Sequence, residues 1–318
     1  METTLTTAAP QGLTSRADAA RVIDYFAAST DVKQSSRALY VRTLNGFFNW
    51  VYNTGRTVGA LILADVIQYK NELLAAGKSS LTVASYINSL RRFFEWTEAV
   101  KLYPNIAKGV HAPKRAQQFR KQPLTVEQVG ELLQYEHAEK SPRDYAIINL
   151  LARTGLRCVE VVRANVSDIT YKGGRRVLLV QGKGRDEKDN FVILTDAAYL
   201  PIAAYLDARG PVDTNAPLFA SESHNNAGGR LTTRAVSGIA KNGLKSVGLN
   251  NRVFTAHSLR HTTAVNILRA GGTLEQVQHT LRHSNPATTQ IYTATLRDEQ
   301  RLTNGGEALL DNLYNFAY

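Results

Sequence analysis

Apolar residues recur three and four positions apart through the first hundred residues of the chain. This spacing places them on one face of a helix, and it predicts helices over about residues 19–29, 39–51, 61–74 and 80–100. Short segments rich in small, polar or glycine residues separate the four helices. Helices joined in this way predict a compact all-α N-terminal domain over residues 18–108.

The second half of the chain combines helices with a short strand pattern. Two apolar, β-branched runs, Arg175–Val180 and Phe191–Leu194, flank a polar segment that contains Gly182-Lys183-Gly184. This pattern predicts a β-hairpin with a long polar turn. Further helices are predicted at about 126–136, 142–154, 196–208, 232–246, 257–270, 274–282 and 287–300. The predicted fold class is therefore mostly α, with a small antiparallel sheet in an α-rich second domain over residues 125–298.

Two other segments have a composition typical of flexible arms and interdomain linkers. Residues 1–17 are rich in Thr, Ala and Gln, and they predict a flexible arm. Residues 109–124 contain two prolines and four cationic residues but no acid, which predicts an exposed basic linker between the two domains. We expect the four cations to lie against phosphate groups, and a merely solvated connector is the alternative. These cations are Lys114, Arg115, Arg120 and Lys121.

The charge of the chain points to a polyanionic partner. Lys and Arg number 38 against 27 Asp and Glu, a formal net charge of +11, which is typical of proteins that bind nucleic acid. No apolar stretch approaches the roughly 18 residues that a membrane span needs, and no secretory signal is visible. The one cysteine, Cys158, cannot form an intrachain disulfide. We therefore expect a cytoplasmic, nucleoid-associated protein with no membrane partner.

Histidine and arginine gather in the C-terminal third of the chain. His257 and Arg260 stand three apart, so both point to one side of the predicted helix. An arginine fork matches two phosphate oxygens, and a histidine supplies a directed donor or a proton acceptor. His257 and His261 also have the spacing of a zinc-binding pair, but Arg260 lies between them and would repel a dication. We expect a phosphate site and no metal.

Five short motifs in one order resemble the tyrosine recombinase (phage integrase, Xer-like) family. They are Thr154-Gly155-Leu156-Arg157 with Glu160, then Gly182-Lys183-Gly184, then His257-Ser258-Leu259-Arg260-His261-Thr262, and finally His283 followed by Tyr292. The resemblance extends from about residue 18 to 298. It implies a SAM-like, core-binding N-terminal domain and a catalytic second domain, and it implies a site-specific DNA recombinase of the integrase or resolvase type.

The resemblance also implies the chemistry. DNA is cleaved and rejoined through a covalent 3′-phosphotyrosine formed by Tyr292, without a metal, ATP or another cofactor. Arg157 and Arg260 would hold the phosphate oxygens and so stabilise the charge that gathers there in the transition state. His257 is the candidate base, His283 a donor to the phosphate, and a lysine in the hairpin the general acid. The implied catalytic set is Arg157, Lys183, His257, Arg260, His283 and Tyr292.

Several alternatives stay open at this point. Lys188 is a rival to Lys183, because the polar turn is longer than the family's usual form. Arg157 could merely pair with Glu160, and Tyr292 could be a core residue of its helix. The rival functions are a type IB topoisomerase-like nicking and closing enzyme, and a DNA-binding clamp without catalysis.

The chain departs from the family's pattern at Arg282, where a glycine usually precedes the histidine. Arg282 would be strained if the position needs a positive φ; otherwise it adds a phosphate contact. The tail over residues 299–318 has apolar residues at helical spacing, and it either caps its own domain or docks on a neighbouring protomer. Docking in trans predicts a homo-tetramer on synapsed, inverted-repeat DNA. We lean towards a role in a mobile element.

Overall fold

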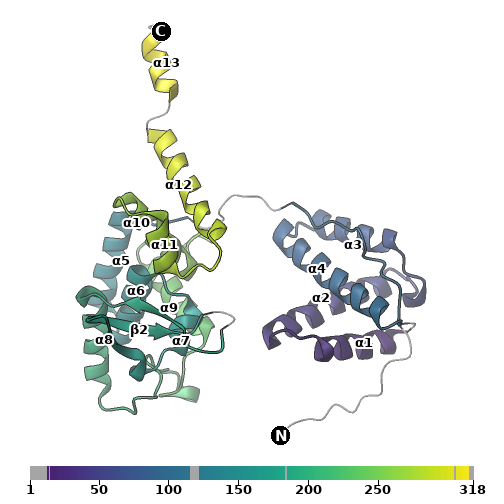
Figure 1. Ribbon diagram of the computed structural model, residues 1–318, viewed down its shortest axis with the longest axis horizontal. Helices are drawn as coiled ribbons and strands as arrows, with labels where there is room; N and C mark the ends of the chain where they lie inside the picture. The colour runs from purple at the N-terminus through teal and green to yellow at the C-terminus, as the bar shows by residue number, and fades with distance from the viewer. Residues whose placement is uncertain (1–12, 14, 115–121, 183–184, 304–305, 315–318) are drawn as a thin grey trace. The chain divides into compact units, whose positions relative to one another are not determined.

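The computed structural model describes residues 13, 15–114, 122–182, 185–303 and 306–314 (Figure 1). The chain divides into two compact units, residues 1–118 and 119–318. The described parts are mostly helical and contain a three-stranded antiparallel sheet, which confirms the predicted fold class. No helix among these residues is long and apolar enough to cross a membrane.

The first unit contains the four predicted helices. They are α1 (Arg16–Ser29), α2 (Gln34–Asn53), α3 (Leu63–Ala75) and α4 (Ser80–Ala99), with a short 3-10 turn, η1 (Val58–Ala60), before α3. Their apolar faces meet in an aromatic core, in which Phe26, Phe47, Phe48 and Phe93 are at most 2% exposed. Phe26 and Phe93 pack edge to face at 5.4 Å, an arrangement that aromatic rings favour.

Two predicted boundaries in this unit differ from the structure. The predicted arm, residues 1–17, extends too far, because Leu13 is buried and Ser15 caps α1 through Asp18. Helix α2 begins five residues earlier than the predicted residue 39, because its first turn is polar and gives no apolar signal. Residues 1–12 and 14, where the rest of the predicted arm falls, lie outside the described residues.

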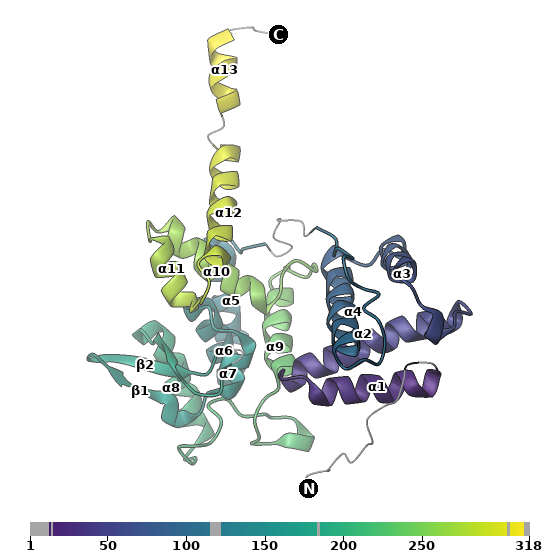
Figure 2. The same cartoon turned by 45° about the vertical axis from the view of Figure 1, so that its right-hand side comes forward.

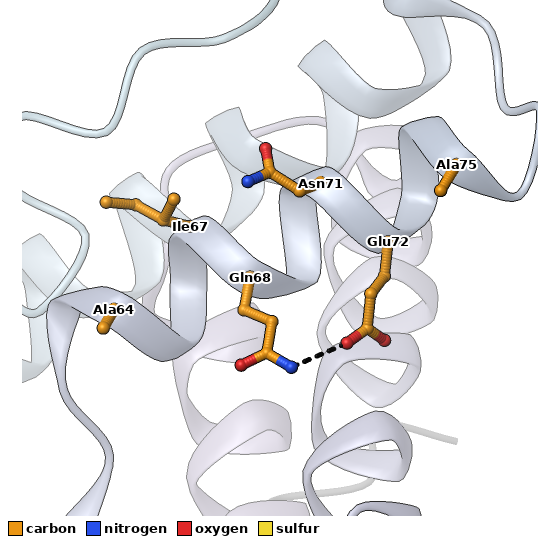
Figure 3. A pocket seen from close by; sticks show the side chains of 6 residues that line it. All are labelled: Ala64, Ile67, Gln68, Asn71, Glu72 and Ala75. Atoms are coloured by element: carbon orange, nitrogen blue, oxygen red, sulfur yellow. Dashed lines mark hydrogen bonds between the residues drawn. The ribbon is translucent and has the colours of Figure 1, made fainter.

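Polar side chains join α3 to α2. Glu72 accepts hydrogen bonds from Trp50 Nε1 at 2.5 Å and from Gln68 Nε2 at 2.9 Å, and Figure 3 shows the second of these contacts. Arg56 binds Asp65 at 2.8 Å and lies over the Trp50 ring. Ala64, Ile67, Asn71 and Ala75 line the shallow pocket on this helix, together with Gln68 and Glu72. These contacts fix α3 on the unit while part of its apolar surface stays exposed.

The second unit is built around α6 (Pro142–Thr154), whose residues from Ala146 to Leu151 are all buried. Around it lie α5 (Val126–Glu139), α8 (Asp196–Arg209), α9 (Thr233–Ser246) and α10 (Ala256–Arg269), all of which pack on α6. The remaining elements are α7 (Cys158–Arg163), η2 (Val166–Asp168), η3 (His224–Asn226), α11 (Leu274–Leu281), α12 (Ala287–Thr303) and α13 (Gly306–Tyr314). The predicted helices of this unit are present with ends shifted by at most three residues, and α6 has the predicted bounds. Helix α7 was not predicted.

The sheet has one strand more than the predicted hairpin. Strand β1 (Ile169–Lys172) pairs with β2 (Arg175–Val180), which pairs with β3 (Asn190–Ile193), all antiparallel. Gly173 and Gly174 join β1 to β2 with φ values of 56° and 73°, the left-handed geometry that a two-residue hairpin requires. In Figure 2 the sheet lies beside α7, on which β2 packs.

Candidate active site

The predicted site residues come from four elements of the second unit. Arg157 caps α7, His257 and Arg260 lie on α10, His283 follows α11, and Tyr292 lies on α12. Arg157 and His283 line one open pocket, which Gly182, Arg185 and Asn190 of the β2–β3 hairpin border. Residues more than a hundred positions apart in the sequence are therefore brought to the same place.

A close approach of α6 to α11 places Arg157. Gly155 ends α6 with a φ of 60°, and a Cβ at this position would lie 2.5 Å from the Leu281 side chain. Only glycine therefore fits here. Arg157 then has extended backbone and caps α7, with its side chain 31% exposed towards the pocket.

Glu160 is buried behind Arg157 and is the acid at the centre of the site. Its Oε1 accepts a hydrogen bond from Arg157 Nη1 at 2.9 Å, and its Oε2 accepts from the Arg157 backbone N–H at 2.7 Å. Burial alone would raise the pKa of Glu160, but Arg282, Arg157 and Arg260 lower it below the ordinary value. A charged carboxylate therefore holds Arg157 on two sides.

The guanidinium of Arg260 is buried and fixed by main-chain oxygens. It is 1% exposed and donates hydrogen bonds to the carbonyls of Gly155 and Leu281. Burial, with the charges of Arg157 and Arg282, lowers its pKa to about 9, so it stays cationic at neutral pH. His257 lies one turn earlier on α10 and is exposed.

His283 is buried beside the arginines. Its Nδ1 lies 2.9 Å from Thr289 Oγ1. Burial first, and then the charges of Arg260, Arg157, Arg282 and His257, lower its pKa to about 4. The imidazole is therefore neutral at pH 7, with one N–H to donate.

Tyr292 is 3% exposed and packs between two histidines. Its ring is parallel to that of His283, with centroids 6.1 Å apart, and lies 5.0 Å from that of His261. Burial raises the pKa of the Tyr292 hydroxyl, whereas Arg260 and Arg157 act in the opposite direction. The tyrosine thus also contributes to a small core with Val265, Val277 and Leu281 of α10 and α11.

Of the two lysines considered as the general acid, the structure describes only Lys188. Lys183 lies outside the described residues, between Gly182 and Arg185 of the hairpin. Lys188 is described, and its Nζ lies 2.5 Å from Asp168 Oδ2 in a largely buried ion pair. The contact of Lys188 is thus with η2, and Lys188 is not among the residues that line the pocket of Arg157 and His283.

Most of the cations predicted to contact DNA belong to the linker over residues 109–124. Lys114 is exposed in the first unit, and Arg115, Arg120 and Lys121 lie outside the described residues. The side chain of Arg282 is 5% exposed, pairs with Glu160 at 2.9 Å and lines the pocket of Arg157 and His283. Its contact with DNA stays a prediction. The positive φ considered for this position is observed, at 55°.

Sequence reasoning did not assign a role to several residues around the site. His261, Thr289, Arg185 and Asn190 touch or border it. His261 and Thr289 lie within the recognised motifs and Arg185 in the predicted polar turn, but their contacts depend on packing between elements.

Family profiles match both units of the chain. The family profile described as "Phage integrase family" matches residues 122–299, and "Phage integrase, N-terminal SAM-like domain" matches residues 21–101. Tyrosine recombinase XerD of Rhizobium meliloti is 31% identical over 83% of this chain and 85% of its own length. Tyrosine recombinase XerC of Escherichia coli O127:H6 is 30% identical over 87% of this chain and 91% of its own.

Solved structures share the fold at lower identity. The XerH site-specific recombinase bound to palindromic difH substrate has a TM-score of 0.69 at 20% identity, covering 92% of this chain and 94% of that one. A lambda integrase dimer bound to a COC′ core site has a TM-score of 0.65 at 18% identity, covering 88% and 95%.

Proposed function

Because the chain belongs to the phage integrase family and is a site-specific tyrosine recombinase, we propose that Tyr292 is the nucleophile with which it cleaves DNA. The observation that carries this assignment is the place of Tyr292, stacked on His283 and within the field of Arg157 and Arg260. Two histidines contact its ring, and the charges of Arg157 and Arg260 act on its hydroxyl, which supports a role beyond packing.

In the proposed first step, Tyr292 Oη attacks the phosphorus of one DNA strand. The new Oη–P bond forms as the P–O5′ bond breaks, which leaves a 3′-phosphotyrosine and a free 5′-hydroxyl. In the second step a 5′-hydroxyl from the partner duplex attacks the same phosphorus and releases the tyrosine. The number of phosphoester bonds does not change, so ATP is not needed.

Arg157 and Arg260 are proposed to bind the non-bridging phosphate oxygens. Charge increases on these oxygens in the pentacoordinate transition state, and fixed guanidinium groups stabilise it without reorganisation. The contacts of Arg157 with Glu160, and of Arg260 with two carbonyls, support this role because they hold both groups rigidly.

Three groups are proposed to move or donate protons. His257, exposed at the start of α10, takes the proton from Tyr292. For His283, whose lowered pKa favours the neutral imidazole, we propose the tautomer in which Thr289 Oγ1 donates to Nδ1 and Nε2–H donates to the phosphate. Lys183 is proposed as the general acid that protonates the leaving 5′-oxygen, and the ion pair of Lys188 with Asp168 supports that choice over Lys188.

Double-stranded DNA with an inverted-repeat core site is the proposed substrate. The net charge of +11 and the DNA-bound state of the similar XerH and lambda integrase structures support it. The domain over residues 18–108 and the catalytic domain over 125–298 would hold the site, with the basic linker over 109–124 against phosphates. We further propose a mobile-element role and association with the nucleoid.

The tail is proposed to dock on a neighbouring protomer and so to hold a homo-tetramer together. Leu302 at the end of α12 and Leu309, Leu313 and Tyr314 of α13 are between 63% and 89% exposed, so these apolar side chains have little cover in the single chain. A mutual exchange of tails around a closed ring would cover these faces.

Covalent capture tests the nucleophile and the reaction class together. The wild-type protein and its Tyr292→Phe variant are incubated with sheared DNA from the source, and denatured protein–DNA adducts are sequenced. Tyr199→Phe is the matched control, because Tyr199 lies against Arg176 and away from the site. Enrichment at one inverted repeat, lost only in Tyr292→Phe, is expected. Scattered attachment would indicate a topoisomerase-like activity, and attachment by Tyr292→Phe would refute the nucleophile.

A further inference from the structure

The turn between α11 and α12 contains an arginine in a conformation that arginine disfavours. Arg282 has φ 55° and ψ 48°, and among the described residues Lys101 is the only other non-glycine residue with positive φ. The N–H groups of Arg282 and His283 bind the carbonyls of His279 and Gln278 at 3.1 and 3.0 Å and so close α11. Glycine would make this turn without strain, so the side chain of Arg282 has to offset that strain.

The side chain of Arg282 points inward and binds two groups at once. Its Nη2 donates to Glu160 Oε2 at 2.9 Å, and its Nη1 donates to the carbonyl of Thr280. Only 5% of the Arg282 side chain and 1% of the Glu160 side chain are exposed. A planar guanidinium can reach a carboxylate and a carbonyl in fixed directions, which a lysine ammonium does less rigidly.

Glu160 is also the residue that holds Arg157. The same Oε2 that binds Arg282 accepts the Arg157 backbone N–H at 2.7 Å, and Oε1 accepts Arg157 Nη1 at 2.9 Å. Arg282, Glu160 and Arg157 therefore form one continuous network of charge-assisted hydrogen bonds. This network joins the start of α7 to the turn that carries His283, and the Arg282–Glu160 contact within it joins residues 122 positions apart.

We propose that Arg282 is a positioning residue that fixes Arg157 and His283 relative to one another. Arg282 acts on Arg157 through Glu160. It acts on His283 through the turn after α11, to which both residues belong. The inference rests on the proposed function, because Arg157 and His283 are the groups that function assigns to the phosphate. It gives the arginine at this position a role that a glycine cannot fill.

A phosphate contact by Arg282 is the competing explanation. Without DNA, both terminal nitrogens of the Arg282 guanidinium donate to groups within the protein. Those of Arg260 do so as well, so the experiment below has to separate the two explanations. The two explanations differ in a measurable way. A phosphate contact contributes to DNA binding and to its salt dependence, whereas a positioning residue contributes to the cleavage rate alone.

The test compares Arg282→Gly, Arg282→Lys and Glu160→Gln with the wild type and with Lys101→Gly. Lys101→Gly is the matched control for removing positive-φ strain away from the site. The probe is a nicked duplex of the sequence recovered by covalent capture, and the readouts are single-turnover cleavage and DNA affinity at several salt concentrations.

We expect Arg282→Gly to cleave on the order of 100-fold more slowly, as when a catalytic group is displaced by about 1 Å, with unchanged affinity and salt dependence. Arg282→Lys should recover part of the rate, and Lys101→Gly should cleave like the wild type. Adding Arg282→Gly to Glu160→Gln should cause little further loss, because the two residues act through one contact. Wild-type cleavage by Arg282→Gly, or a reduced salt dependence of its binding, would overturn the proposal.

A structure of the DNA-free Arg282→Gly protein decides the matter independently of activity. We expect the Glu160 side chain to turn and the Arg157–Glu160 contact to be lost or lengthened. An unchanged contact in a folded variant would overturn the inference, even if the wild type itself failed to cleave DNA. That last failure would count against the proposed function instead.

Discussion

Glu136 provides a direct test of how burial and electrostatics control the stability of the second unit. Its side chain lies on α5 at 1% exposure, and its Oε1 has no hydrogen-bond partner among the described residues. Helix α9 packs so closely that a Cβ at Gly243 would lie 2.6 Å from this oxygen. A buried carboxylate without a partner favours its neutral form.

The pKa of Glu136 is accordingly raised from 4.5 to about 7, first by burial, with Lys140 lowering it and Asp144 raising it further. In the unfolded chain the carboxyl ionises near 4.5, so the folded state binds the extra proton between these two values. The contribution of Glu136 to the free energy of unfolding is therefore greatest below pH 4.5 and is lost as the pH rises through 7. The shift corresponds to about 3 kcal/mol, and relaxation of the folded protein around the charged carboxylate reduces this to about 2 kcal/mol.

Glu136→Gln replaces the carboxyl by a neutral group of the same shape. We expect it to be about 2 kcal/mol more stable than the wild type at pH 8 and nearly equal to it at pH 4.5. For a unit of this size the gain at pH 8 corresponds to roughly 4 to 8 °C in Tm. The measurement is thermal unfolding of both proteins from pH 4.5 to 8.5, followed by circular dichroism and calorimetry.

The matched control is Glu139→Gln, which removes an exposed carboxylate from the same helix. Comparison with this variant separates the effect of burial from that of removing a negative charge from α5. If the difference between Glu136→Gln and the wild type is constant from pH 4.5 to 8.5, Glu136 is ionised in the folded protein and the reasoning is refuted.

Three further predictions concern the reaction. Lys183→Ala should cleave ordinary DNA at least about 100-fold more slowly but regain the rate on DNA with a 5′-bridging sulfur, whose leaving group needs no proton; the same rescue for Lys188→Ala would reverse the assignment. Cleavage measured as covalent adduct should be unchanged by EDTA, because guanidinium groups bind the phosphate, and a strict metal requirement would contradict that mechanism. Deletion of residues 302–318 should reduce synapsis and recombination more than binding to a single site in gel-shift assays, and unchanged recombination would remove docking of the tail in trans.

Much of the fold follows from local patterns that a single sequence carries. Helices α3 and α4 were predicted within two residues, because apolar side chains spaced along one helix face are readable without any partner. The polar first turn of α2 and the short strand β1 were missed. Neither has a run of apolar residues long enough to be seen, although Gly173-Gly174 is a hairpin signal that could have located β1.

In the candidate site too, some features follow from local sequence and others depend on packing. Arg157, His257, Arg260, His283 and Tyr292 could be proposed from motifs, because each motif is short and contiguous. Their surroundings could not, since contacts such as Arg260 with the Gly155 carbonyl join residues 105 positions apart. The distance between such residues depends on how α6, α10 and α11 pack, and not on local spacing.

The sequence by itself determined the family, the helical fold class and the residue types of the reaction. Only the tertiary structure decided that Lys188 pairs with Asp168, and that Arg282 turns inward to Glu160. The physical reason is that an isolated segment records propensity and amphipathicity, which are local. Burial and ion pairing depend on which segments meet, so the sequence alone does not show that Arg282 contacts Glu160.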